Sequence, residues 1–275
     1  SLSYQWAKQT GGTGTPANIS SATTDTLTLS PTAVQPGDSI LCRVTATDSS
    51  GDTAQGTDSV TVTNSRPVVT SVAVTPDTGV TTSTALTCSA TANDPDGGSP
   101  TISFEWAKQT GGAGSVVNLS VTTATLTLTS SIVQPNDVVF CRATATDAQG
   151  ASTNATDSVI VGNSDPLMTK VEITPDSGIS TTDLLSCSGT ALDPDGGTPT
   201  ISYEWSLGGT VVGSSDTLQL TNTGFAPNDV VVCTATATDS DGGSDSLTDS
   251  ITIQNTKPTI RNVAISPATG VTTST

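Results

Sequence analysis

The sequence contains no histidine, only 8 lysine and arginine residues against 25 aspartate and glutamate residues, and only 3% aromatic residues. The absence of histidine removes the commonest general base and the commonest zinc ligand. The net charge of −17 disfavours nucleic-acid binding, because neutralising a phosphate backbone requires clustered lysines and arginines. No run of about 18 apolar residues is present, so the sequence predicts no membrane-spanning helix. We therefore expect neither an enzyme nor a nucleic-acid-binding protein.

Internal repetition organises the whole chain. The stretch TISFEWAKQTGGAG that begins at residue 101 matches SLSYQWAKQTGGTG at residue 1, and DPDGG occurs at 94–98 and again at 193–197. A repeat of about 92–100 residues has the size of one small domain. The predicted divisions are an incomplete domain at 1–64, whole domains at 65–163 and 164–256, and the first strand of a further domain at 257–275. The chain is thus expected to be an excerpt of a longer array.

Short polar linkers separate the repeats. They read TNSRP at 63–67, GNSDP at 162–166 and QNTKP at 254–258. In each linker an asparagine is followed three residues later by a proline, whose fixed φ angle stiffens the chain. The linkers are therefore predicted to be semi-rigid joints.

Within a repeat the apolar residues alternate with a period of two. In the stretch 137–146, one face carries apolar side chains and the other carries Arg142 and two threonines. This alternation is typical of a half-buried strand, and no stretch shows a convincing helical stripe. The inward rows are Ile40, Cys42, Val44 and Ala46; Val139, Cys141, Ala143 and Ala145; and Val231, Cys233, Ala235 and Ala237. The predicted class is all-β.

The cysteines and tryptophans recur in the order Cys, Trp, Cys. Trp106 stands between Cys88 and Cys141, and Trp205 stands between Cys187 and Cys233. This order resembles the immunoglobulin fold, in which a disulfide joins two sheets and a tryptophan packs on it. The resemblance implies the pairs Cys88–Cys141 and Cys187–Cys233, and a partner for Cys42 on a strand that precedes residue 1. The alternative is that these cysteines are free and buried, since they pack well as small hydrophobes.

Further motifs resemble bacterial tandem immunoglobulin-like modules and the PKD and cadherin-like repeats of large surface proteins. They are V-x-[VI]-[TS]-P, DPDGG, PND or PGD before the second cysteine, and TATD-x-x-G after it. The resemblance implies immunoglobulin-like β-sandwiches arranged end to end. Disulfides persist outside the reducing cytosol, so we expect an extracellular or cell-surface location.

Acidic loops are the candidate site. In the fold that the sequence resembles, the loops before the tryptophan strand and after the second cysteine strand meet at the end that receives the linker. Carboxylates gathered there are suitable ligands for Ca²⁺, which takes six to eight oxygens. The stronger candidates are Asp165, Asp193, Asp195, Asp239 and Asp241, and the weaker ones are Asp94, Asp96 and Asp147. The alternative is that these aspartates cap turns or pair with Arg66 and Lys257 of the linkers.

One apolar residue per repeat stands at an outward position just before the second cysteine. These equivalent residues are Leu41, Phe140 and Val232. A column of outward apolar side chains is a candidate lateral contact, although a single exposed apolar residue in each domain is ordinary.

The function expected from these features is structural. We interpret the chain as a segment of a long extracellular fibre, stalk or adhesin that requires no cofactor and has no catalytic residues. Its expected partners are other repeats of the same protein, including self-association into a filament. The alternatives are a ligand- or glycan-binding adhesion module and an accessory region of a secreted enzyme.

Overall fold

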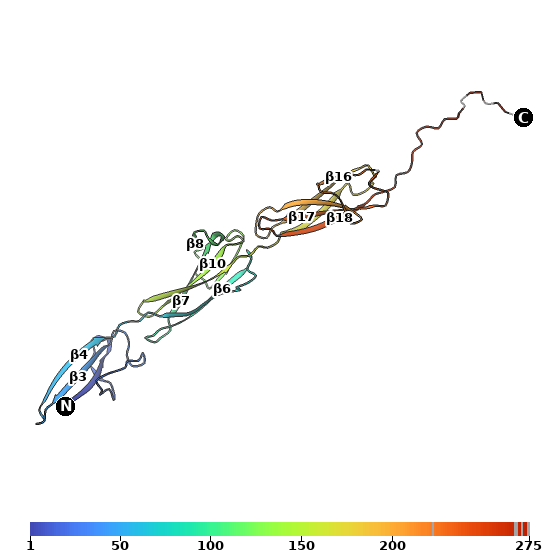
Figure 1. The fold of residues 1–275 in the computed structure, drawn as a ribbon. Coiled ribbons are helices and arrows are strands. Elements are labelled where there is room, and N and C mark those ends of the chain that lie inside the picture. Colours follow the sequence, from blue (N-terminus) through green and yellow to red (C-terminus); the bar gives the residue numbers. More distant parts are fainter. Residues whose placement is uncertain (222, 267–268, 271, 274–275) are drawn as a thin grey trace. The chain divides into compact units, whose positions relative to one another are not determined.

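The computed structural model describes residues 1–221, 223–266, 269–270 and 272–273. The chain forms two compact units, Ser1–Asn163 and Ser164–Thr275. Both units are built from antiparallel strands, which form five sheets (Figure 1). No helix in the part of the chain described here is long and apolar enough to cross a membrane.

Residues 1–64 form a single sheet in the strand order β2-β1-β3-β4. In this sheet Trp6 stands opposite Cys42, while Ala7 stands opposite Leu41 on the other face. Cys42 is a free cysteine. The elements are β1 (Leu2–Gln9), the 3₁₀ turn η1 (Thr10–Gly12), β2 (Ala17–Asn18), β3 (Ser39–Thr47) and β4 (Thr53–Thr61).

Residues 65–163 form a complete two-layer sandwich. A three-stranded sheet in the order β5-β6-β9 faces a four-stranded sheet in the order β11-β10-β7-β8. Figure 1 shows β6 in one layer and β7 and β10 in the other. The elements are β5 (Val68–Thr75), β6 (Ala85–Asn93), β7 (Thr101–Gln109), η2 (Thr110–Gly112), β8 (Val116–Asn118), β9 (Thr125–Thr127), β10 (Val138–Thr146) and β11 (Ser152–Ile160).

The second unit repeats this sandwich. Its sheets run in the orders β12-β13-β16 and β15-β14-β17-β18. The predicted all-β class and the sandwich architecture are therefore confirmed. The elements are β12 (Leu167–Thr174), β13 (Leu184–Leu192), β14 (Thr200–Leu207), β15 (Thr210–Gly213), β16 (Thr217–Gln219), β17 (Val230–Thr238) and β18 (Ser244–Thr252).

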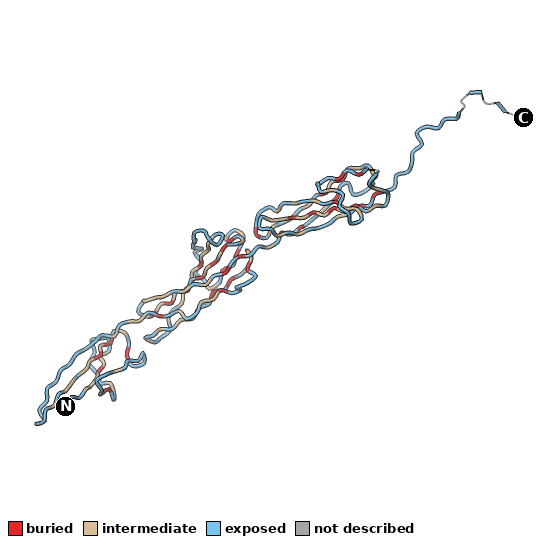
Figure 2. Tube along the Cα trace, in the orientation of Figure 1, coloured by how far each residue is buried: buried red, intermediate tan, exposed pale blue. Residues whose placement is uncertain are grey.

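The core of each sandwich lies between its two sheets. Trp106 and Trp205 have no exposed surface, and each indole N–H donates to a backbone carbonyl, that of Thr123 or Ser215. Buried and exposed residues alternate along the inner strands, as the period of two predicts (Figure 2). All eight residues of the inward rows on β10 and β17 are fully buried.

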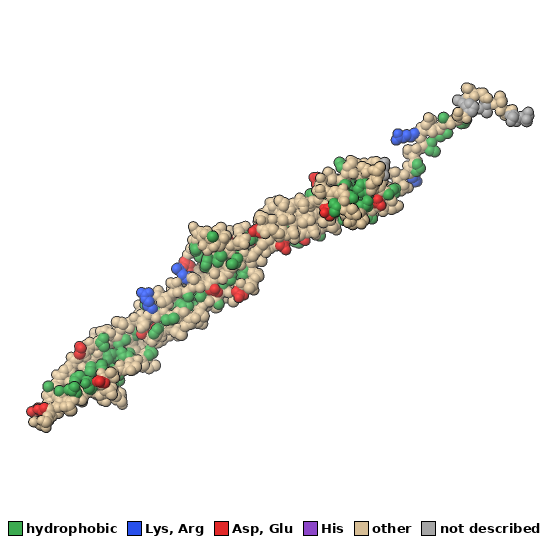
Figure 3. All heavy atoms as spheres, in the orientation of Figure 1, with side chains coloured by type: hydrophobic (Ala, Val, Ile, Leu, Met, Phe, Trp, Pro, Cys, Tyr) green, Lys and Arg blue, Asp and Glu red, His purple; other side chains and the backbone are tan. Residues whose placement is uncertain are grey.

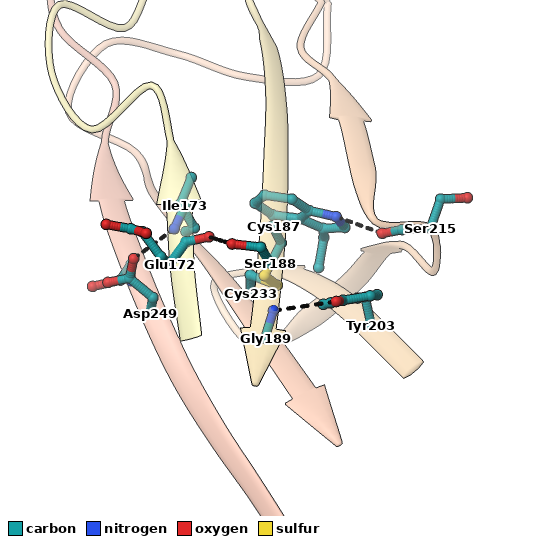
Figure 4. The surroundings of a disulfide bond; sticks show 11 residues. Glu172, Ile173, Cys187, Ser188, Gly189, Tyr203, Ser215, Cys233 and Asp249 are labelled. Atoms are coloured by element: carbon teal, nitrogen blue, oxygen red, sulfur yellow. Dashed lines mark hydrogen bonds between the residues drawn. A yellow bond between two sulfur atoms is a disulfide. The ribbon is translucent and has the colours of Figure 1, made fainter. Parts of the chain in front are cut away.

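A disulfide joins the two sheets of each sandwich. Cys88 on β6 is bonded to Cys141 on β10, and Cys187 on β13 is bonded to Cys233 on β17. These are the pairs that the immunoglobulin resemblance implies. Figure 4 shows the second bridge with Tyr203 beside it, where the tyrosine hydroxyl accepts a hydrogen bond from the Gly189 N–H.

Residues 257–275 differ from the prediction. This segment was expected to supply the first strand of a further domain, but its described residues form no strand. A strand requires backbone pairing with a neighbour, and the described residues of this segment pair with none. Positions 267–268, 271 and 274–275 of the predicted strand lie outside the described residues.

Candidate functional site at the linkers

The DPDGG loop of the second sandwich holds the linker that precedes it. Asp94 caps the loop by accepting the backbone N–H of Asp96 at 2.9 Å. The Asp96 carboxylate then accepts two hydrogen bonds from Ser65, one from its backbone N–H and one from its hydroxyl at 3.1 Å. We call this arrangement the linker clamp. It ties the first residue of the repeat to a loop about 30 residues later in the sequence.

The same linker clamp recurs in the third repeat. Asp193 accepts the backbone N–H of Asp195 at 2.9 Å. The Asp195 carboxylate accepts the Ser164 backbone N–H at 2.5 Å and the Ser164 hydroxyl at 3.1 Å. Asp195 is only 3% exposed, so water cannot replace these donors without opening the loop. Repetition of the geometry indicates that the second aspartate of each DPDGG loop recognises the serine of the linker.

A second contact reaches the first linker from the loop between β10 and β11. Asp147 uses one carboxylate oxygen to accept the N–H groups of Gln149 and Ala151, at 2.9 and 2.8 Å. Its other oxygen accepts the side-chain amide of Asn64 at 2.8 Å. The hydrogen bond from Asn64, aided by the loop N–H groups, outweighs partial desolvation and holds the pKa of Asp147 below its ordinary value.

The linker chain is held on both sides of this joint. The Val62 N–H donates to the Asp38 carbonyl at 2.8 Å, within the sheet of residues 1–64. Asn64 and Ser65 are bound by Asp147 and Asp96 of the next sandwich. Only Thr63 lies between the residues anchored on each side. The oxygen of the Asn64 amide is buried and has no hydrogen-bond partner among the described residues.

The other predicted metal ligands have separate surroundings. Asp239 caps its loop by accepting the N–H groups of Asp241 and Gly243, at 2.9 and 2.8 Å, while Asp165 is exposed. Across the described parts of the chain, no three acidic or cysteine side chains are gathered closely enough to hold a metal ion. The hydrogen bonds fit the turn-capping alternative, and Ca²⁺ binding stays a prediction.

The cation expected at the first linker makes a different contact. Arg66 donates to the backbone carbonyl of Ser152 at 3.3 Å rather than to one of the loop aspartates. The linker therefore gains a third point of attachment, at the start of β11.

Two buried aspartates were not among the predicted site residues. Asp38 and Asp137 each accept N–H groups from two loops and lie beside a lysine, with Lys108 Nζ 3.1 Å from Asp137 and Lys8 Nζ 3.6 Å from Asp38. The signal was present in the recurring PGD and PND motifs, together with Lys8 and Lys108 at equivalent places. These contacts hold two loops together beside the strand that carries the lysine.

Comparisons with known proteins find similar solved structures only at low sequence identity among those described below. No family model matches the sequence, and no curated protein matches it. A solved structure described as a Ca²⁺-stabilized adhesin that helps an Antarctic bacterium reach out and bind ice is 16% identical, with a TM-score of 0.33 over 92% of this chain and 65% of that one. A tetra-tandem repeat from the extending region of a large adhesion protein is 17% identical, with a TM-score of 0.33 over 90% and 66%.

A third similar structure contains the immunoglobulin domains 1–5 of Sidekick-1. It is 15% identical, with a TM-score of 0.31 over 93% of this chain and 52% of that one. The chain spans less than two thirds of the length of each of these three structures. The assignment of the fold rests on the sheets and disulfides described above.

Proposed function

We propose that this chain is a structural spacer of an extracellular fibre, stalk or adhesin. The linker clamp carries the proposal. A spacer must keep successive domains extended, and a linker whose residues are hydrogen-bonded to the following sandwich bends less than a free one. Hydrogen bonds to a charged acceptor contribute about 1.5–3 kcal/mol each, so the paired bonds from Ser65 to Asp96 are a substantial restraint.

The disulfides support the extracellular location and a mechanical role. They persist only where thiols are not kept reduced. Each bridge closes a loop, of 53 residues in the second repeat and 46 in the third, and a closed loop does not extend under tension. A sandwich pulled from its ends therefore gains length only from the residues outside the loop.

The surface suits a polymer that stays in solution. The charge is spread thinly, and in Figure 3 lysine and arginine form only a few separate groups on the visible face. A net charge of −17 favours solubility.

Pulling single molecules of the full chain tests this function. With the disulfides intact, unfolding of the second repeat should lengthen the chain by at most about 160 Å, from the roughly 45 residues outside the loop. Reduction should add about 190 Å from the 53 residues inside it. A variant with both Asp96→Ala and Asp195→Ala should unfold at lower force than the parent chain. Equal unfolding forces for the two proteins would contradict a mechanical role for the linker clamp.

Ca²⁺ at the joints is a separate proposal. Its ligands would be Asp165, Asp193, Asp195, Asp239 and Asp241. It expects a higher Tm in excess Ca²⁺ than in EDTA, and loss of that difference in an Asp193→Asn variant. Equal melting temperatures in Ca²⁺ and EDTA would contradict this proposal.

A further inference from the structure

The sheet that carries the tryptophan strand has an outer face in every repeat, which we call the lateral face. In the second repeat this face contains a groove of about 350 Å³ between β7, β8 and β10. Ala107, Phe140 and the exposed Val116 line the groove, and Glu105 and Arg142, which form an ion pair, line it as well.

The first repeat has a groove at the equivalent place. It is smaller, about 40 Å³, and is lined by Gln5, Ala7, Leu41 and Arg43 among others. The strand register shows the equivalence. Leu41 stands opposite Ala7 as Phe140 stands opposite Ala107, and Arg43 stands opposite Gln5 as Arg142 stands opposite Glu105.

The third repeat carries the same face with different side chains. Val232 stands opposite Ser206, and Thr234 stands opposite Glu204. The apolar centre is thus retained as Val232, while a threonine occupies the position of the arginine. Glu204 is exposed and makes no ion pair with any residue that the structure describes.

The lateral faces consequently differ in charge in a regular way. In the first repeat Arg43 stands opposite an uncharged glutamine and pairs with no described carboxylate. In the second repeat the arginine and the glutamate neutralise each other. In the third repeat Glu204 stands alone opposite a threonine. The first face is positive, the second is neutral and the third is negative.

We propose that the lateral face of residues 1–64 binds the lateral face of residues 164–256 in a second copy of this chain. Leu41 packs against Val232, and Arg43 pairs with Glu204. The opposite charges at equivalent positions make the two faces complementary, whereas two identical faces would set like charges against each other. This inference rests on the proposed function, and it identifies which surface assembles the fibre.

The small side chains around the contact suit two packed sheets. Stacked sheets lie about 10 Å apart, and Ala7 on one face and Ser206 on the other leave room for the leucine and the valine. Such a contact joins different surfaces of the two copies. A contact of this kind either closes into a ring or continues as an open filament.

The long-range repulsion between two acidic chains does not prevent this contact. At physiological ionic strength charges are screened beyond about 8 Å. An arginine and a glutamate in direct contact therefore still attract each other, while the net charge of −17 on each copy is largely screened. The affinity comes from the apolar centre, and the ion pair selects which faces meet.

Sedimentation velocity of the full chain over a range of concentrations tests the proposal. Every protein carries Cys42→Ser, because this free cysteine would otherwise allow disulfide-linked dimers. The parent protein is expected to associate reversibly. Arg43→Glu and Glu204→Arg should each raise the dissociation constant about 10-fold, and the double variant should recover the parent value because the pair is reformed with its charges exchanged.

Matched controls lie on the opposite sheet of the third repeat. Lys170→Glu and Glu172→Arg make the same changes in charge at the exposed ion pair of β12, and should leave association unchanged. A parent protein that stays monomeric at about 1 mM overturns the proposal, as does association that Arg43→Glu leaves intact. The proposal is also overturned if the double variant fails to recover the parent dissociation constant. The pulling experiment is done on single molecules, so its result does not depend on this outcome.

Discussion

The Asp157 carboxylate accepts the backbone N–H of Val74, with 2.8 Å between the nitrogen and Oδ2. Asp157 is on β11, at the edge of the four-stranded sheet, and Val74 is on β5 of the facing sheet. Asp249 on β18 accepts the N–H of Ile173 on β12 at the same distance (Figure 4). In both sandwiches a carboxylate on one sheet thus accepts a backbone N–H from a strand of the facing sheet. Strand pairing does not provide such a hydrogen bond, because it joins strands within one sheet.

Removing this acceptor should destabilise the second sandwich. Val74 is 2% exposed, so in an Asp157→Ala variant its N–H would be buried without a partner. Leaving such a donor unsatisfied costs about 1–3 kcal/mol. Hydrogen exchange followed by mass spectrometry should show faster exchange of β5 in the variant, together with a lower free energy of unfolding.

Asp58 provides the matched control for that experiment. It occupies the same place in the TDS motif of the first repeat, but its carboxylate accepts only the N–H of its neighbour Ser59 among the described residues. Asp58→Ala should therefore change the stability by less than about 0.5 kcal/mol. Equal losses in the two variants would show that the contact with the first strand is unimportant.

The joint between the first two repeats should respond to loss of Asn64. Because the amide of Asn64 is the largest influence that lowers the pKa of Asp147, Asn64→Ala should raise that pKa toward its ordinary value of 3.8. An NMR titration of the carboxyl carbon would measure the change. Thr63→Ala, one residue earlier in the linker, is the control and should leave the titration curve in place.

The sign of the pH effect follows from the direction of this shift. A carboxyl whose pKa is lower in the folded protein stabilises the fold above the ordinary pKa, and the contribution is lost as the pH falls through the lower value. The contact between Asn64 and Asp147 is therefore expected to be complete at neutral pH and to weaken in acid below about pH 4. A titration unchanged by Asn64→Ala would contradict the contact.

The sequence allowed the sandwich to be predicted because its signals are local or repeated. The alternation of Val139, Cys141 and Ala143 identifies a strand and its inner face. The spacing of each cysteine pair around a tryptophan identifies the fold through resemblance. The partner of Asp157 could not be found in this way, because Val74 is 83 residues away and an aspartate in a strand is usually solvated.

The linker contacts were predicted in part. Loop position placed Asp96 and Asp195 near the linkers, and the structure brings both against a linker serine. Their hydrogen-bond partners were not identified, since serine and aspartate are common in every loop of this chain. The only signal was that Ser65 and Ser164 each precede a DPDGG loop by the same interval.

Acid should also weaken the buried pair Asp137 and Lys108. Burial alone would raise the pKa of Asp137, but the N–H groups of Gly111 and Gln134, together with Lys108, outweigh it and lower the pKa below 3.8. The stabilisation is therefore complete above about pH 5 and is lost as the pH falls through the lowered pKa. The unfolded chain takes up the proton first, which favours unfolding.

A comparison with Asp137→Asn measures this contribution. At pH 7 the variant should be less stable by about 2 kcal/mol, because it loses hydrogen bonds to a charged acceptor and the ion pair. The difference should shrink as the pH falls through the lowered pKa of Asp137, because the parent carboxyl is then itself protonated. Urea unfolding at several pH values measures this difference, and one that stays constant throughout the titration of Asp137 would contradict the assignment.

The two disulfides should contribute nearly equally to stability. In the chain-entropy model a loop of 53 residues and one of 46 residues each stabilise the fold by about 4 kcal/mol. Removing both cysteines of one bridge, as in Cys88→Ala with Cys141→Ala, avoids leaving a reactive thiol in the core. The equivalent variant replaces Cys187 and Cys233.

Hydrogen exchange measured separately for each repeat distinguishes the effects of the two disulfides within one chain. Each double variant should lower the protection of its own sandwich by about 4 kcal/mol and leave the other sandwich unchanged, because each core is closed around its own tryptophan. A loss below about 1 kcal/mol would mean that packing around Trp106 or Trp205 is sufficient without the bridge. Loss of protection in the unmodified sandwich would mean that the repeats do not fold independently.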